Sequence, residues 1–194
     1  MVALESEDVL ERGDEAPTFE LEGVDDETHS LLDFSDAEGL LVVFTCNHCP
    51  YAKAKFDEMN RLAAEFDEVP VVGINPNDAG EYPEDDFETM VERVKEGTIQ
   101  WDAYLRDESQ EVAAAYGATC TPDPFLFEGD NGMFRLAYHG RLDNGHNPDD
   151  EVTEREMKGH IEDLLAGRDV DEEFRPSRGC SVKWKPGNEP EYWE

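Results

Sequence analysis

The stretch FTCNHCPYAKAKF, residues 44–56, places two cysteines close together between a run of aliphatic residues and a helical pattern. Residues 39–44 (GLLVVF) form a continuous apolar run of strand length, which is typical of a strand covered on both faces. After Pro50 the apolar residues are spaced by three or four with charges between them, as in an amphipathic helix. The cysteine pair is therefore expected where a buried strand passes into a helix.

This position favours redox chemistry at the pair. Unpaired backbone N–H groups and the positive end of the helix dipole stabilise a thiolate at the start of a helix. We expect Cys46 to be this residue and the nucleophile, and His48 to add to the stabilisation. Cys49, one turn into the helix, would attack a mixed disulfide at Cys46 and release the reduced substrate. The interpretation requires the two sulfurs to lie close together and to be accessible to solvent.

The rest of the chain predicts an α/β fold. Residues 69–75 (VPVVGIN) form a second buried-strand pattern, which would lie parallel to the first through a right-handed connection. Pro83 is expected to open a second long helix that ends near Gly97. The further expected elements are short extended pieces within 14–34, a strand at 101–105, a short helix at 108–116, strands at 125–127 and 134–138, and a last helix from a capping box at Thr153 and Glu156 to Gly167.

The strand, CxxC-Pro and helix arrangement resembles the thioredoxin fold. The opening GDEAPTFELEG resembles the start of the alkyl hydroperoxide reductase and thiol-specific antioxidant branch of that superfamily. A closer resemblance is to peroxiredoxin-like thioredoxin family proteins, and it is carried by TCNHCPYA (45–52), INPNDAGEYPEDDFETM (74–90), YGATCTPDPFLF (116–127) and GCSVKWK (179–185). The resemblance implies a central mixed sheet flanked by helices, with an N-terminal extension and a C-terminal tail. We expect one domain over residues 1–167 and a tail over 168–194 that packs on it.

The resemblance also implies a substrate site. In thioredoxin-like folds a cis-proline loop faces the redox pair and offers backbone groups to an incoming peptide. Pro122 is the candidate for this proline, and an ordinary turn with trans prolines is the alternative. Thr121 and Pro122, with Asn47 and His48 between the two cysteines, are the residues expected to bind the substrate.

Two departures from the related families bear on the mechanism. Thioredoxin has a buried acid six residues before its first cysteine, and Leu40 stands there in this chain, so a proton acceptor for Cys49 must come from elsewhere. Peroxiredoxins have a threonine three residues before their peroxidatic cysteine. If Cys49 is placed at that cysteine, Cys46 takes the position of the threonine, which argues against efficient peroxide reduction.

Two other interpretations of the cysteines stay open. Cys46, His48 and Cys49 could join Cys120 or Cys180 to bind copper(I) or zinc, since these metals suit thiolate and imidazole ligands. A structural crosslink is less favoured, because a disulfide that closes so small a loop removes little chain entropy. The four cysteines permit three pairings, and the sequence does not choose among them.

The composition limits the possible partners. The chain has 49 acidic and 16 basic residues and a formal net charge of -33, which would repel nucleic acids and anionic membranes. An acidic, lysine-poor surface resembles proteins of salt-accumulating halophiles, where molar salt shortens the Debye length to about 3 Å. The start of the chain has no signal-peptide pattern, and no apolar run is long enough to span a bilayer, so we expect a cytoplasmic protein.

These observations together predict a thiol-disulfide oxidoreductase that works through Cys46 and Cys49 in antioxidant defence. Its expected partners are a protein or small-molecule disulfide and a thiol electron donor, with no cofactor and no metal. A thiol-dependent peroxidase of peroxiredoxin type and a copper- or zinc-binding module are the alternatives.

Overall fold

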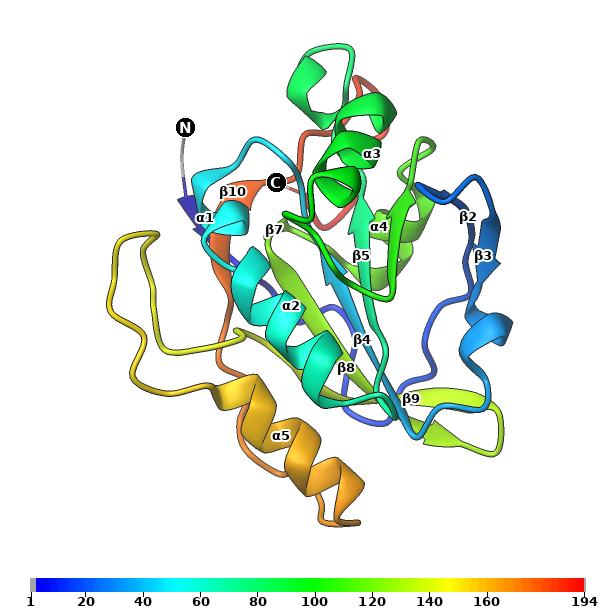
Figure 1. Ribbon diagram of the computed structural model, residues 1–194, viewed down its shortest axis with the longest axis vertical. Coiled ribbons are helices and arrows are strands. Elements are labelled where there is room, and N and C mark those ends of the chain that lie inside the picture. Colours follow the sequence, from blue (N-terminus) through cyan, green and yellow to red (C-terminus); the bar gives the residue numbers. More distant parts are fainter. Residues whose placement is uncertain (1–2, 194) are drawn as a thin grey trace.

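The computed structural model describes residues 3–193 and is built around a mixed sheet (Figure 1). Over this range the main sheet has seven strands in the order β3-β2-β6-β5-β4-β8-β9. Its central strand β4 pairs parallel with β5 and antiparallel with β8. The strands of the main sheet are β2 (Glu20–Gly23), β3 (Thr28–Ser30), β4 (Gly39–Phe44), β5 (Val71–Asn75), β6 (Ala103–Arg106), β8 (Asp123–Asp130) and β9 (Met133–His139). The expected α/β fold with a central mixed sheet is confirmed.

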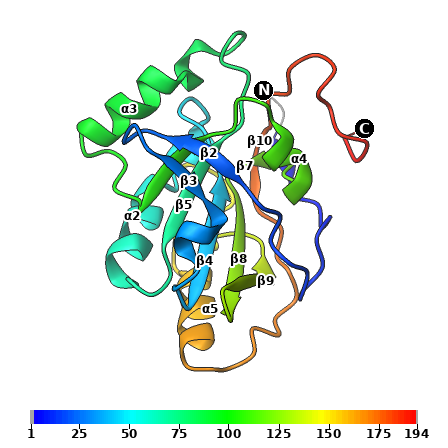
Figure 2. The same ribbon diagram turned by 90° about the vertical axis from the view of Figure 1, so that its right-hand side faces the viewer.

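Helices cover both faces of this sheet (Figures 1 and 2). Alternate residues of β4 point to opposite sides, so Leu41 and Val43 pack in one apolar cluster with α2 and α5, while Leu40 and Val42 pack in a second cluster with α4. The α-helices are α1 (Pro50–Lys53), α2 (Phe56–Glu65), α3 (Phe87–Lys95), α4 (Glu111–Tyr116) and α5 (Glu156–Leu165), and the 3-10 helices are η1 (Leu31–Phe34) and η2 (Pro83–Asp85). In the described range no helix is both long and apolar enough to cross a bilayer.

Three helix boundaries differ from the sequence-based expectation. The helix after the cysteine pair is split into α1 and α2. Pro83 opens only the short η2, and the long helix α3 starts afterwards with Asp86 as its N-cap, whose side chain accepts a hydrogen bond from the Thr89 N–H. The capping box at Thr153 is wrong, because Thr153 pairs with Asn144 and α5 begins three residues later.

A second, smaller sheet carries the end of the chain to the centre of the molecule. It consists of β1 (Ala3–Glu5), β10 (Arg178–Ser181) and β7 (Cys120–Thr121), with β10 in the middle and both pairings antiparallel. The register places Cys180 opposite Thr121. Gly179 allows this close approach, because a Cβ there would lie 2.0 Å from the Thr121 carbonyl oxygen. Figure 1 shows β10 next to α1, the helix that follows the cysteine pair.

Candidate active site

The cysteine pair lies in the loop that joins β4 to α1. The helix begins at Pro50, and Cys49 is its N-cap residue with an extended backbone. Proline is well suited to the first helical position, because its fixed φ fits the helix and its missing N–H has no partner to lose. Cys46 lies three residues before this N-cap. The expectation that Cys46 occupies the start of the helix is therefore wrong, and Cys49 holds that place.

The surroundings of Cys49 favour its thiolate. A hydrogen bond from the Cys46 side chain is the largest cause that lowers its pKa, and the Cys180 side chain and the backbone N–H groups of Ala52 and Cys180 add to it. Although burial opposes ionisation, the pKa of Cys49 falls to about 5. The Cys49 Sγ lies 3.5 Å from the Thr121 carbonyl oxygen, which accepts a hydrogen bond from the S–H group when Cys49 is a thiol.

Cys46 has the opposite character. Burial raises its pKa well above the ordinary value, and the hydrogen bond to Cys49 and the charge of Asp85 act in the same direction. Its Sγ lies 3.3 Å from Thr121 Oγ1. The pKa values of the two thiols are thus shifted in opposite directions, which favours a Cys46 thiol hydrogen-bonded to a Cys49 thiolate.

The two sulfurs lie close together, as expected, but they are not accessible. Cys46 and Cys49 are both 0% exposed, and Cys120 and Cys180 are buried as well. The expectation of a solvent-exposed pair is therefore not met. A substrate can reach either sulfur only if part of the surrounding structure moves.

The loop opposite the pair has the expected proline geometry. The Thr121–Pro122 peptide bond is cis, so the alternative of two trans prolines is wrong. The Pro122 carbonyl accepts hydrogen bonds from the Ser177 hydroxyl, at 2.7 Å, and from the Cys120 thiol, at 3.5 Å. Thr121 pairs with Cys180 of β10. The edge expected to receive a peptide is thus occupied by the protein's own C-terminal segment.

A buried carboxylate anchors the loop between the two cysteines. Asp85 is 0% exposed and accepts hydrogen bonds from the Asn47 backbone N–H at 2.7 Å, His48 Nδ1 at 2.5 Å and Asn77 Nδ2 at 2.8 Å. Burial alone would raise the pKa of Asp85. The hydrogen bonds that Asp85 accepts, of which that from His48 has the largest effect, outweigh burial and lower the pKa. Asp85 in turn raises the pKa of His48 through their hydrogen bond. Asp85 is not among the site residues that the sequence predicts, and its only signal there is its place in the acidic stretch that carries the family resemblance.

The side chains of Asn47 and His48 form hydrogen bonds within the protein. The Asn47 side chain accepts a hydrogen bond from the Tyr104 hydroxyl at 2.8 Å and donates to the Glu84 carbonyl at 3.0 Å. The His48 side chain is 5% exposed and stacks on the ring of Tyr82. Hydrogen bonds from Asn47 and His48 fix the CxxC loop to the segment around η2.

The comparisons with known proteins identify a family for the chain. The model of the AhpC/TSA family matches residues 12–136, which is more than half of the chain. The chain belongs to the AhpC/TSA family. A search of curated proteins finds no match.

Several solved structures are similar to this AhpC/TSA protein. An uncharacterized conserved protein from Geobacillus kaustophilus is 40% identical with a TM-score of 0.88, and the match covers 96% of this chain and 98% of that one. A hypothetical protein from Sinorhizobium meliloti is 34% identical with a TM-score of 0.87, and the match covers 94% of this chain and 99% of that one. The Mycobacterium tuberculosis peroxidoxin BcpB, at 18% identity, a TM-score of 0.54 and coverage of 80% and 94%, shares the fold alone.

One group of side chains in this AhpC/TSA protein has the spacing of a metal site. Among the described residues, the ligand atoms of Cys46, His48 and Asp85 lie within 4.8 Å of one another. His48 Nδ1 and Asp85 are already joined by a hydrogen bond, and the Cys46 pKa is raised, so a metal would have to displace a proton and break that bond. The set that the sequence suggested, with Cys120 or Cys180 as a further ligand, does not form such a group in the described residues.

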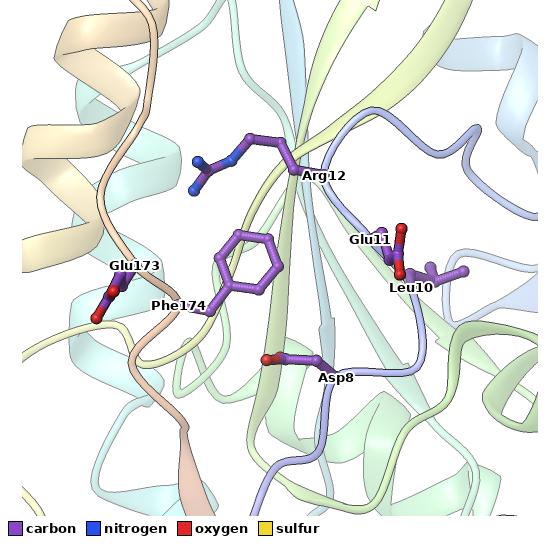
Figure 3. A pocket seen from close by; sticks show the side chains of 6 residues that line it. All are labelled: Asp8, Leu10, Glu11, Arg12, Glu173 and Phe174. Atoms are coloured by element: carbon purple, nitrogen blue, oxygen red, sulfur yellow. The ribbon is translucent and has the colours of Figure 1, made fainter.

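A separate hollow lies on the surface, away from the thiols. It has a volume of about 480 Å³, and Arg12 stacks over the Phe174 ring at 5.0 Å along its wall (Figure 3). The Arg12 guanidinium also donates hydrogen bonds to the Ala137 and Glu172 carbonyls, through Nε and Nη2. The lining residues are Asp8, Leu10, Glu11, Arg12, Glu173 and Phe174, and none of the four cysteines is among them.

Proposed function

We propose that this AhpC/TSA protein is a thiol-disulfide oxidoreductase in which Cys46 and Cys49 alternate between dithiol and disulfide. The observation that carries the proposal is the position of Cys49 as the N-cap of α1 with the Cys46 sulfur beside it, an arrangement that lowers the pKa of Cys49 and raises that of Cys46. A thiolate is the attacking species in thiol-disulfide exchange. The geometry therefore favours Cys49 as the first nucleophile and Cys46 as the resolving thiol, which reverses the roles expected from the sequence.

The reaction proceeds in two exchange steps. The Cys49 thiolate attacks a disulfide RSSR, forms a bond to one sulfur and releases the other as RS⁻. The Cys46 sulfur then attacks Cys49 Sγ, which forms the Cys46–Cys49 disulfide and releases the second RS⁻. The second RS⁻ takes up the proton that Cys46 loses, so it leaves as RSH. Two electrons pass from the pair to the substrate, and an external thiol restores the dithiol.

The cover over the site favours a small substrate. A peptide that binds by strand addition needs free backbone groups beside the cis-proline. Thr121 already pairs with Cys180 of β10, and both reactive sulfurs are buried. A low-molecular-weight disulfide needs only a local opening of the structure, whereas a protein disulfide needs displacement of β10. Thr121 and Pro122 then bind the substrate only after such an opening.

Variants of the two cysteines test this proposal with oxidised glutathione as the probe. Cys49→Ser should form no glutathione adduct and lose turnover, whereas Cys46→Ser should still form the adduct at residue 49. Cys120→Ser is the matched control, because Cys120 is equally buried but donates to the Pro122 carbonyl. Intact-protein mass spectrometry after acid quenching measures the adducts. Full turnover in Cys49→Ser would exclude the proposed mechanism, and an adduct that needs Cys46 instead would restore the roles expected from the sequence.

Reduction of peroxides is a second candidate for the same site. It is favoured by the lowered pKa of Cys49, because a thiolate is also the species that attacks a peroxide. The Cys49 thiolate would attack ROOH to give a sulfenic acid and ROH, and Cys46 would condense with it to form the disulfide and water. Trapping of a sulfenic acid at Cys49 with dimedone would support this activity. Oxidation of the protein by hydrogen peroxide no faster than that of a free thiol would exclude it.

A further inference from the structure

Cys180 brings a third thiol to the redox pair. It lies in β10, opposite Thr121, and its side chain is hydrogen-bonded to that of Cys49. The backbone N–H of Cys180 also points its hydrogen at the Cys49 sulfur. Cys49 therefore has a thiol on each of two sides, one from its own loop at Cys46 and one from the C-terminal segment.

We propose that Cys180 is a third exchanging thiol, which forms a disulfide with Cys49 and resolves adducts on Cys49 in parallel with Cys46. The inference rests on the proposed function, because it needs an adduct on Cys49. It extends that function by giving the enzyme two alternative oxidised forms, Cys46–Cys49 and Cys49–Cys180.

The step balances without any additional reagent. With an adduct Cys49–S–S–R in place, the Cys180 sulfur attacks Cys49 Sγ and forms the Cys49–Cys180 bond. The bond between Cys49 and the R sulfur breaks, and RS⁻ takes up the proton that Cys180 loses, so RSH leaves. Cys180 is oxidised and R is reduced. The same external thiol that reduces the Cys46–Cys49 disulfide returns this form to the dithiol.

Burial suits Cys180 for this internal role. Cys180 is 2% exposed, so external disulfides have no direct path to it, but attack on Cys49 occurs inside the protein. Contact between α1 and β10 keeps the two sulfurs in the same small region. Cys120, in the adjacent strand, directs its thiol to the Pro122 carbonyl instead. The side chains thus distinguish Cys180 from the other cysteine outside the CxxC loop.

The experiment removes Cys46 so that only Cys180 can resolve the adduct. Three variants are mixed with oxidised glutathione and quenched in acid at intervals, and their masses are measured by intact-protein mass spectrometry. The variants are, in order, Cys46→Ser, Cys46→Ser/Cys180→Ser and Cys46→Ser/Cys120→Ser. The adduct should form and then disappear in the first and third variants. It should persist in the second, with a lifetime at least about tenfold longer, because no thiol next to Cys49 remains to attack it.

Peptide mapping identifies the product. Trypsin cleavage places Cys49 in the peptide 13–53 and Cys180 in the peptide 179–183, so their disulfide joins two separate peptides. This linked pair should appear in Cys46→Ser as the adduct disappears. The same pair should appear in partially oxidised wild-type protein, which tests the proposal without any substitution. Circular dichroism checks that each variant is folded.

The outcomes separate the inference from the proposed function. An adduct that forms at Cys49 but persists equally with and without Cys180, with no linked pair in either Cys46→Ser or wild type, would overturn the inference alone. If neither the wild type nor any of the three variants forms an adduct at Cys49, both the inference and the proposed function are overturned. Loss of the adduct in Cys46→Ser with appearance of the linked pair supports both.

Discussion

Acidification should protonate Cys49 with a midpoint near pH 5, and this is the most direct test of the site's electrostatics. An ordinary thiol, with a pKa of about 8.5, is only about 3% ionised at pH 7. With a pKa of about 5 for Cys49, about 99% of the molecules carry the thiolate at that pH. The fraction of the attacking species thus rises by more than tenfold.

Ultraviolet absorbance of the thiolate, followed from pH 8 to pH 4 in the reduced protein, measures this transition. The transition should be absent in Cys49→Ser and unchanged in Cys120→Ser. Because the Cys46 hydrogen bond is the largest cause of the lowered pKa, Cys46→Ala should move the midpoint upward. Cys46→Ser keeps a hydroxyl donor and should move it less than alanine does.

Two results would refute the reasoning. A wild-type midpoint near that of an ordinary thiol would show that the helix start and the neighbouring donors do not stabilise the Cys49 thiolate. A midpoint near 5 that survives in Cys49→Ser and vanishes in Cys46→Ser would place the thiolate on Cys46.

Three further predictions concern stability and the surrounding groups. Burial opposes the charge of His139, but Asp8 and Asp123, which both bind its ring, raise its pKa to about 9. The stabilisation from this charge is fully present below about pH 6.5 and is lost as the pH rises through 9. The free energy of unfolding in urea should therefore fall over this pH range in the wild type, and fall less in His139→Gln. Gly179→Ala should lower the free energy of unfolding by about 1–3 kcal/mol, because the new Cβ meets the Thr121 carbonyl at 2.0 Å; an unchanged thermal midpoint would contradict the close approach of β10. Lowering the salt concentration from molar to dilute buffer lengthens the Debye length from about 3 Å to about 10 Å or more. The free energy of unfolding should then fall, because the carboxylates of a chain with a net charge of -33 repel one another more strongly. Equal stability at both salt concentrations would count against the halophilic interpretation.

The sequence predicts those parts of the fold that depend on local patterns. The apolar runs identify β4 and β5, because a strand covered on both faces needs apolar residues at every position. The cis-proline at Pro122 follows from its family resemblance. The start of the helix after the cysteines was misplaced although a signal was present, since Pro50 at the first helical position makes Cys49 the N-cap.

The rest of the site depends on contacts between distant parts of the chain. Asp85 reaches the CxxC loop from η2 because Asn47 and His48 donate hydrogen bonds to it, and no spacing in the sequence encodes that pairing. Cys180 reaches Cys49 because β10 pairs with β7, and a lone cysteine in a tail carries no signal of its partner. Long-range hydrogen bonds therefore place a buried carboxylate and a third thiol beside the CxxC loop, which local sequence patterns do not predict.

Under the proposed mechanism, the C-terminal segment links the size of the substrate to the choice of resolving thiol. β10 covers Thr121, where a peptide would bind, and the same strand holds Cys180 beside Cys49. Any movement of β10 that frees the edge of β7 for a protein disulfide also withdraws Cys180 from Cys49. Reduction of proteins and resolution by Cys180 are therefore alternatives, and a protein substrate would leave resolution to Cys46 alone. Gly179→Ala, which pushes β10 away from β7, should accordingly raise the reduction of protein disulfides relative to glutathione disulfide and reduce the yield of the Cys49–Cys180 disulfide.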